Sequence, residues 1–132
     1  MKNIEQALLA RSRAYTPYSK FKVGAAILLK DGRYILGANI ENASFGLSNC
    51  AERSALYALY SQGIPKEDIV SITVIADDEG PVSPCGACRQ VMHELMPKDA
   101  KVILANTKGD IMETTTDQLL PYAFMFDEVA DE

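Results

Sequence analysis

Three cysteines fall in two short segments whose spacing suggests metal chemistry. The segments are Cys50-Ala51-Glu52-Arg53 and Pro84-Cys85-Gly86-Ala87-Cys88. An odd number of cysteines argues against a disulfide framework. Three thiolates at the starts of two predicted helices are suited to hold Zn²⁺ with one tetrahedral corner left for water, whereas a structural site normally closes all four corners. The sequence therefore predicts a catalytic zinc site formed by Cys50, Cys85 and Cys88.

Charged residues next to Cys50 complement such a site. The carboxylate of Glu52 would stand beside the activated water, where it is suited to transfer protons. Three thiolates and one Zn²⁺ leave a net negative charge, which would weaken the metal as a Lewis acid. The positive ends of the two helices offset part of this charge. Arg53, one helical turn after Cys50, is predicted to donate hydrogen bonds to the thiolates, and Arg89 is a weaker candidate.

Other interpretations of the cysteines remain open. They could be buried apolar thiols, or Cys85 and Cys88 could form a redox pair, although neither reading explains the acid at position 52. A closed structural zinc site would need His93, the single histidine, as its fourth ligand. His93 lies about 140° around an ideal helix from Cys88, so we expect it to point away from the metal.

Composition limits the possible partners. The chain has 132 residues, with 13 basic and 18 acidic side chains and a net charge of −5. The basic residues are scattered and the last six residues are mainly acidic, so we expect no nucleic-acid partner. The longest apolar run, 23–29, is too short to span a bilayer, and the N-terminus lacks a signal-type apolar stretch. These features predict a cytoplasmic protein that acts on a small uncharged molecule, with no membrane partner.

Hydrophobic periodicity and turn residues predict alternating helices and strands. We expect a helix from an Asn3 cap to about Tyr15, a hairpin of strands 23–29 and 34–38, a helix over about 50–62, a buried strand 69–76, a helix over about 85–96, strands 102–105 and 111–113, and a last short helix capped by Thr116. Strands that alternate with helices imply parallel pairing through helical crossovers. The predicted fold class is α/β, with a mixed five-stranded sheet, helices on both faces and a single domain of residues 1–132.

The order Cys50-x-Glu52 followed by Pro84-Cys85-x-x-Cys88 is a signature of zinc deaminases, and the resemblance extends over nearly the whole chain. The blocks that resemble homotetrameric cytidine deaminases are Tyr18-Ser19-Lys20-Phe21-Lys22-Val23-Gly24-Ala25-Ala26, Asn39-Ile40-Glu41-Asn42-Ala43, Cys50-Ala51-Glu52-Arg53, Pro84-Cys85-Gly86-Ala87-Cys88-Arg89-Gln90-Val91 and Leu119-Leu120-Pro121-Tyr122-Ala123-Phe124. The resemblance implies a three-layer α/β/α sandwich, a Zn²⁺ cofactor, and hydrolysis of cytidine and deoxycytidine to uridine and deoxyuridine with release of ammonia in pyrimidine salvage.

The resemblance also assigns substrate-binding roles. It implies that Asn39 and Glu41 bind the ribose 3′-hydroxyl, that Phe21 packs on the base, and that Ala43 and the main chain near Cys85 read the cytosine edge. Phe124 matches an aromatic residue that reaches into a neighbouring subunit's site, which implies a homotetramer with shared active sites.

From the residues alone, Asn39 and Glu41 could instead be loop caps, and Phe21 and Phe124 could be core residues. Phe45 departs from the family, whose members usually carry Tyr there. Three other functions also remain open: deamination of a modified cytosine nucleoside such as blasticidin S, deamination of bases in RNA or DNA, and a non-enzymatic zinc-stabilised module.

Overall fold

A five-stranded sheet forms the middle of the molecule, which a computed structural model describes over residues 1–125. The strands are β1 (Val23–Leu29), β2 (Tyr34–Ala38), β3 (Ile69–Ala76), β4 (Lys101–Asn106) and β5 (Ile111–Thr114), in the spatial order β2-β1-β3-β4-β5. β1 is antiparallel to both β2 and β3, whereas β3 and β4 are parallel. The edge strand β5 is antiparallel to β4, a direction that the sequence pattern left open. The mixed five-stranded sheet is thereby confirmed.

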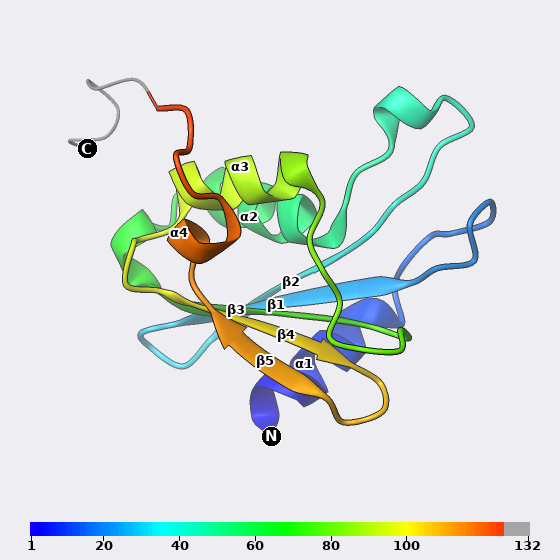
Figure 1. Cartoon of the computed structure of the whole chain (residues 1–132), viewed down its shortest axis with the longest axis horizontal. Coiled ribbons are helices and arrows are strands. Elements are labelled where there is room, and N and C mark those ends of the chain that lie inside the picture. The colour runs from blue at the N-terminus through cyan, green and yellow to red at the C-terminus, as the bar shows by residue number, and fades with distance from the viewer. Residues whose placement is uncertain (126–132) are drawn as a thin grey trace.

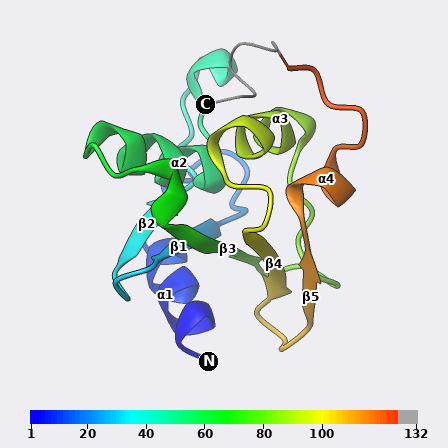
Figure 2. The same ribbon diagram turned by 90° about the vertical axis from the view of Figure 1, so that its left-hand side faces the viewer.

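Helices cover both faces of this sheet, as Figures 1 and 2 show. The helices are α1 (Lys2–Arg11), α2 (Ala51–Ser61), α3 (Gly86–Leu95) and the short α4 (Thr116–Leu119), with 3₁₀ turns at Phe45–Leu47 and Lys66–Asp68. α1 lies on one face, and α2 and α3 lie side by side on the other. The three-layer α/β/α arrangement is confirmed. Among the helices of residues 1–125, none combines the length and apolar character needed to cross a membrane.

The larger hydrophobic core lies between the sheet and the pair α2 and α3. It includes fully buried side chains of both helices and of four strands, among them Ile27, Leu56, Leu59, Ile72, Met92 and Leu104. A smaller core of Ala7, Ala26, Ile75 and Ala105 lies under α1. Because burial of apolar side chains is the dominant favourable contribution to folding, the larger core holds the first turns of α2 and α3 at fixed places above the sheet.

Two glycines allow the helices to approach the sheet closely. A Cβ atom at Gly37 of β2 would lie 2.4 Å from the backbone nitrogen of Ala55 in α2. A Cβ atom at Gly24 of β1 would lie 2.1 Å from the carbonyl oxygen of Ala7 in α1. Both separations are shorter than any real carbon contact, so each glycine lets a helix backbone rest directly on a strand. At Gly37 this contact fixes α2, which carries Glu52.

Three predicted helix boundaries were wrong. Met1, not Asn3, is the N-cap of the first helix, and the helix ends at Arg11 rather than Tyr15. The side chain of Asn3 instead accepts a hydrogen bond from the Tyr34 hydroxyl, and Tyr15 pairs with the chain at Ile40. The last helix is capped by Thr115, one residue before the predicted cap. The side chain of Thr115 accepts a hydrogen bond from the backbone nitrogen of Gln118.

Candidate active site

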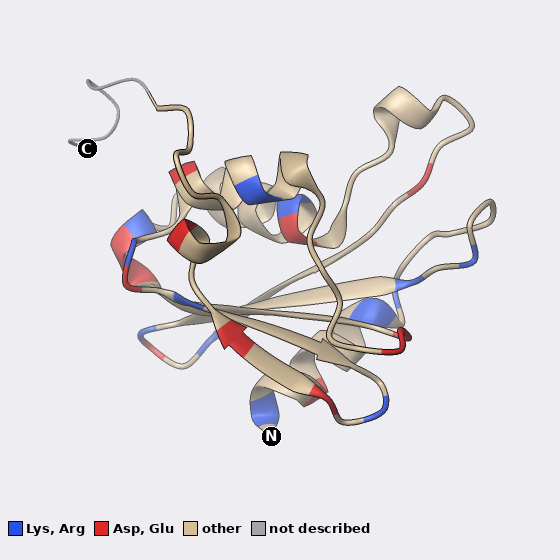
Figure 3. Ribbon diagram, in the orientation of Figure 1, with Lys and Arg blue, Asp and Glu red and all other residues tan. Residues whose placement is uncertain are grey.

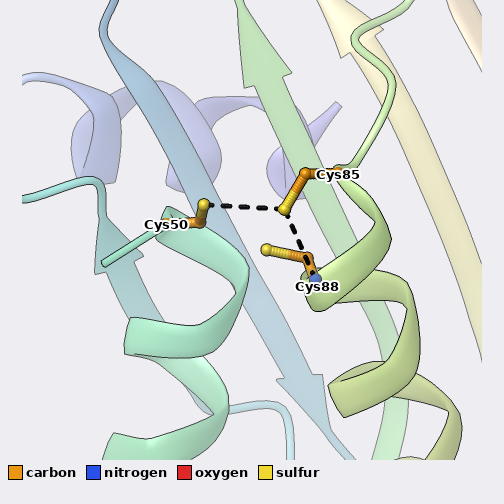
Figure 4. A group of neighbouring side chains, drawn as sticks. All are labelled: Cys50, Cys85 and Cys88. Atoms are coloured by element: carbon orange, nitrogen blue, oxygen red, sulfur yellow. Dashed lines mark hydrogen bonds between the residues drawn. The ribbon is translucent and has the colours of Figure 1, made fainter. Parts of the chain in front are cut away.

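The sulfur atoms of Cys50, Cys85 and Cys88 face one another between the first turns of α2 and α3 (Figure 4). Cys50 is the N-cap of α2, Cys85 is the N-cap of α3, and Cys88 lies in the first turn of α3. All three sulfurs lie within 4.8 Å of one another, and those of Cys50 and Cys85 are 3.9 Å apart. Soft thiolates at this spacing form a donor set that suits Zn²⁺.

The charge on these sulfurs is stabilised from several directions. The Arg53 guanidinium donates to the Cys50 sulfur over 3.3 Å, as the sequence predicted, and the Cys88 backbone N–H donates to the Cys85 sulfur over 3.4 Å. A hydrogen bond with the Cys88 thiol, together with Arg53, lowers the pKa of Cys50 to about 5. The same bond raises the pKa of Cys88, whose thiol keeps its proton and donates a hydrogen bond to the Cys50 sulfur. A divalent cation between the sulfurs would displace that proton, because the thiolate is the ligand form.

Glu52 is a buried acid beside the cysteines. It lies in the first turn of α2 and only 4% of its surface is exposed. Burial raises the pKa of its carboxyl group, and the negative charge of Cys50 raises it further. An acid with a raised pKa holds and releases protons closer to neutral pH than an exposed one, which suits a group that transfers protons.

Two other side chains near the cysteines are used elsewhere. Arg89 donates to the carbonyl oxygens of Pro84 and Leu119, at 2.8 Å each, and to the Ser83 hydroxyl at 2.7 Å. These three bonds go to oxygen acceptors, and among the side-chain hydrogen bonds of residues 1–125 it is Arg53, not Arg89, that donates to a cysteine sulfur. His93 binds the Asp117 carboxylate at 3.1 Å, so the closed structural site with a histidine ligand is not formed.

Backbone pairing links the predicted sugar-binding residues to the cysteines. Ile40 exchanges hydrogen bonds with Asn49 at 2.9 and 3.0 Å, and Asn49 directly precedes Cys50. On the other side of this strand end, Tyr15 donates to the Asn39 carbonyl and accepts from the Glu41 N–H. The segment 39–41 is therefore held between the chain after α1 and the start of α2.

The side chains of Asn39 and Glu41 hold the loop that carries Phe21. Asn39 accepts from the Val23 N–H and donates to the Phe21 carbonyl, both at 2.8 Å. The Glu41 carboxylate accepts from the N–H groups of Tyr18 and Ser19 at 3.1 Å and from the Ser19 hydroxyl. The Ser19 hydroxyl lowers the pKa of Glu41 and keeps it ionised. These bonds match the loop-cap interpretation that the sequence left open, and they fix the carboxylate in one orientation.

The remaining predicted substrate-binding residues lie in exposed positions. Phe21 is 40% exposed, Phe124 is 66% exposed, and Ala43 belongs to the exposed loop that precedes the 3₁₀ turn. Phe45 is 76% exposed, and its ring meets that of Tyr18 edge to face. Within one chain, the centre with the three cysteines is assembled and these residues are not gathered into an enclosed site.

A pocket of about 350 Å³ is lined by Glu41 together with Tyr18, Ser19, Phe45 and Ser48. A larger cavity of about 480 Å³ lies between the start of α1 and strands β3 to β5. The larger cavity contains none of the predicted site residues, so we place the site by its chemistry and not by cavity size.

Sequence reasoning missed Ser19 and Gln90. Ser19 was noted only within the resemblance, yet its hydroxyl and N–H both bind Glu41. The Gln90 amide donates to the Phe124 carbonyl at 2.9 Å. The signal for Ser19 was its place in a Tyr-Thr-Pro-Tyr-Ser turn, which favours side-chain to backbone hydrogen bonds. Nothing in the spacing of Gln90 and Phe124 indicated their contact.

The α/β/α fold with three clustered cysteines and an adjacent buried acid defines a zinc deaminase architecture. The family model for the cytidine and deoxycytidylate deaminase zinc-binding region matches residues 1–105, so the chain belongs to that family.

Similar proteins carry the same description. The chain is 59% identical over 128 residues to a cytidine deaminase of Halalkalibacterium halodurans, covering 97% of this chain and 96% of that one. It is 49% identical over 129 residues to a cytidine deaminase of Sporosarcina psychrophila, covering 98% and 93%. A crystal structure of cytidine deaminase from Burkholderia pseudomallei superimposes with a TM-score of 0.90 at 49% identity, covering 93% of this chain and 97% of that chain.

Proposed function

We propose that this chain is a zinc-dependent hydrolase that converts cytidine to uridine and ammonia. The observation that carries the proposal is the buried Glu52 next to three clustered cysteines, in a chain of the deaminase family. Deoxycytidine is proposed as a second substrate, and pyrimidine salvage as the setting. Within residues 1–125 no side-chain contact favours the antibiotic or nucleic-acid alternatives, and Figure 3 shows Lys and Arg spread over the ribbon.

In the proposed mechanism, Cys50, Cys85 and Cys88 would hold Zn²⁺, which when bound would lower the pKa of a water molecule and so supply a nucleophile at neutral pH. Glu52 accepts the proton of that water and gives it to N3 of the cytosine ring. After the water oxygen has bonded to C4, Glu52 carries the remaining proton of that water to the exocyclic amine, the C4–N bond breaks, and water and cytidine have become uridine and ammonia. Arg53 holds the Cys50 sulfur and reduces the electron density that it donates to the metal.

For substrate recognition, we propose that Glu41 and Asn39 bind the ribose 3′-hydroxyl, Phe21 packs on the base, and Ala43 and the main chain near Cys85 meet the cytosine edge. The fixed, ionised Glu41 carboxylate beside the pocket supports this, because an oriented anion is a strong hydrogen-bond acceptor. The loop-cap bonds do not use every acceptor position of a carboxylate, which offers about four.

We propose a homotetramer in which Phe124 of one chain closes the site of another. Several of the most exposed large apolar side chains lie in the 40–49 loop and the C-terminal segment: Phe45 at 76%, Leu47 at 73% and Phe124 at 66%. Apolar surface of this kind is typical of a face that a partner covers. The supporting argument is that one chain leaves the nucleoside side of the site open, while a dry site strengthens electrostatic stabilisation of the attacked ring.

Subunit mixing tests shared sites. Phe124→Ala and Glu52→Gln chains are each expected to be inactive alone, and co-refolding them should restore activity in sites that combine an intact Glu52 with an intact Phe124. Mass spectrometry of the mixture verifies that chains exchange. Exchange without recovered activity would exclude shared sites.

We also propose a domain organisation and a location for the chain. We propose that residues 1–132 form one domain, supported by a sheet whose strands extend from 23 to 114. We propose a cytoplasmic location, supported by three free cysteines that a reducing compartment would preserve.

The direct test of the function is an ultraviolet assay of purified protein with cytidine, deoxycytidine, cytosine and cytidine monophosphate. We expect conversion of the two nucleosides and little conversion of the base, which lacks the sugar, or of the charged nucleotide. No conversion of cytidine by zinc-loaded protein would refute the proposal, and preference for cytosine would refute the role of the ribose contacts.

A further inference from the structure

Arg89 in α3 contacts both the loop just before α3 and the end of α4, which lies 30 residues further along the chain. Its guanidinium donates through Nε to the Pro84 carbonyl, through Nη2 to the Ser83 hydroxyl and through Nη1 to the Leu119 carbonyl, at 2.7 to 2.8 Å. Its backbone N–H meanwhile donates to the Cys85 carbonyl in the first turn of α3. One side chain thus joins the loop before Cys85 to the end of α4.

The hydrogen bond from Arg89 to the Pro84 carbonyl restrains the backbone atoms at the start of Cys85. The peptide between Pro84 and Cys85 is planar, so a fixed carbonyl oxygen also fixes the nitrogen and Cα atom of Cys85. Cys85 is exposed, unlike Cys88, and therefore has fewer packing contacts to hold its sulfur in place. The hydrogen bonds of the Arg89 guanidinium therefore restrain the Cys85 backbone where packing does not.

The hydrogen bond from Arg89 to the Leu119 carbonyl restrains the C-terminal segment, residues 119–124. Next to Arg89, the Gln90 amide donates to the Phe124 carbonyl at 2.9 Å, so consecutive residues of α3 hold both ends of residues 119–124. Tyr122, between these two points, has a positive φ of 57°, a conformation that is uncommon for a bulky residue and that persists where the surrounding structure holds it.

We infer that Arg89 is a positioning residue that couples the place of the Cys85 sulfur to the place of the C-terminal segment, whereas Gln90 acts on that segment alone. The inference rests on the proposed function only in taking Cys85 as a metal ligand. The guanidinium geometry is essential, because a single ammonium group cannot reach three acceptors in a planar fork.

The test compares Arg89→Met, Arg89→Lys and Gln90→Ala with Arg33→Met, a matched loss of an arginine in the β1–β2 turn, where Arg33 pairs only with Asp31 among the described residues. Zn²⁺ affinity is measured with a competing chelator, and hydrogen exchange is measured at the amides of Leu119 and Leu120, which donate within α4. Neither readout depends on turnover. Faster hydrogen exchange at the amides of β3 would indicate a general loss of stability.

Both Arg89 variants should weaken Zn²⁺ binding about 10- to 100-fold, the range for residues that orient a metal ligand, and speed exchange at Leu119 and Leu120 while β3 is unchanged. Gln90→Ala should speed exchange and leave Zn²⁺ affinity within twofold of Arg33→Met. If Arg89→Met does not fold, Arg89→Lys and Ser83→Ala, which removes one acceptor, give the same comparison.

Zn²⁺ affinity equal to that of Arg33→Met in the folded Arg89 variants would overturn the inference. Full rescue by Arg89→Lys would also overturn it, because charge alone would then be sufficient. Failure of the unaltered chain to bind Zn²⁺ would count against the proposed function and not against the Arg89 contacts.

Discussion

Two regions of the molecule differ in how completely a single chain forms them. The first, the cysteine centre, consists of Cys50, Glu52, Arg53, Cys85 and Cys88. The second, which we call the nucleoside rim, consists of the residues proposed to bind the nucleoside: Phe21, Asn39, Glu41, Ala43 and Phe124. In the cysteine centre the sulfurs already lie within 4.8 Å of one another and Glu52 is 4% exposed. In the nucleoside rim two aromatic rings are exposed and the polar side chains bind loop backbone.

This difference follows from how each region is held. The cysteine centre stands on the first turns of two helices that are anchored in the larger core, and Gly37 lets α2 rest directly on β2. The nucleoside rim stands on loops and on the C-terminal segment, where hydrogen bonds replace packing. We therefore expect changes in the centre to abolish chemistry and changes in the rim to weaken or redirect substrate binding.

The largest expected effect is that of Glu52→Gln. It should keep the fold and bound zinc but lower turnover of cytidine by about 10²–10⁴-fold or more, because a positioned acid–base group contributes that much and Glu52 serves several proton transfers. Metal content and a turnover assay check this, with the exposed Glu67→Gln as the control. Turnover within a few-fold of the unaltered chain would exclude Glu52 as the proton carrier.

A smaller, substrate-dependent effect is expected at Glu41. Glu41→Ala should lower kcat/KM for cytidine by about 10- to 100-fold, the consequence of losing a hydrogen bond to a charged group. The loss for 3′-deoxycytidine should be much smaller, and unfolding by urea, which reports the loss of the three loop-cap hydrogen bonds, should change far less than substrate use. The exposed Glu79→Ala serves as the control. Equal losses for both nucleosides would mean that Glu41 acts only as a loop cap.

The smallest expected effect is a change in the pKa of Glu41 when Ser19 is replaced. A carboxyl whose pKa is lowered on folding contributes stability that is present above its ordinary pKa of 4.5 and is lost as the pH falls through the lowered value. Ser19→Ala removes the main cause of this lowering, so the pKa of Glu41 should rise toward 4.5, as followed by carboxyl-carbon NMR. Ser44→Ala in the exposed loop is the control. An unchanged pKa would show that the backbone donors alone fix the carboxylate.

The same contrast explains what the sequence could predict. The cysteine group and the Arg53 contact depend on spacings of a few residues at helix starts, and β1, β2 and β3 follow from local hydrophobic pattern and turn residues. The cap at Met1 rather than Asn3, the bonds of Ser19 to Glu41, and the three partners of Arg89 depend on residues that meet only after folding. Local pattern carries no information about such contacts.

The central claim is that Cys50, Cys85 and Cys88 together hold one zinc ion that the reaction requires. The direct measurement is to remove metal with a chelator, add Zn²⁺ back stepwise, and follow bound zinc and cytidine turnover together. We predict that turnover is lost with the metal and returns in proportion up to one zinc per chain. We also predict that Cys85→Ala does not retain zinc and does not recover cytidine turnover when Zn²⁺ is added back. Cytidine turnover in metal-free protein, or full zinc retention and normal activity in Cys85→Ala, would contradict this account.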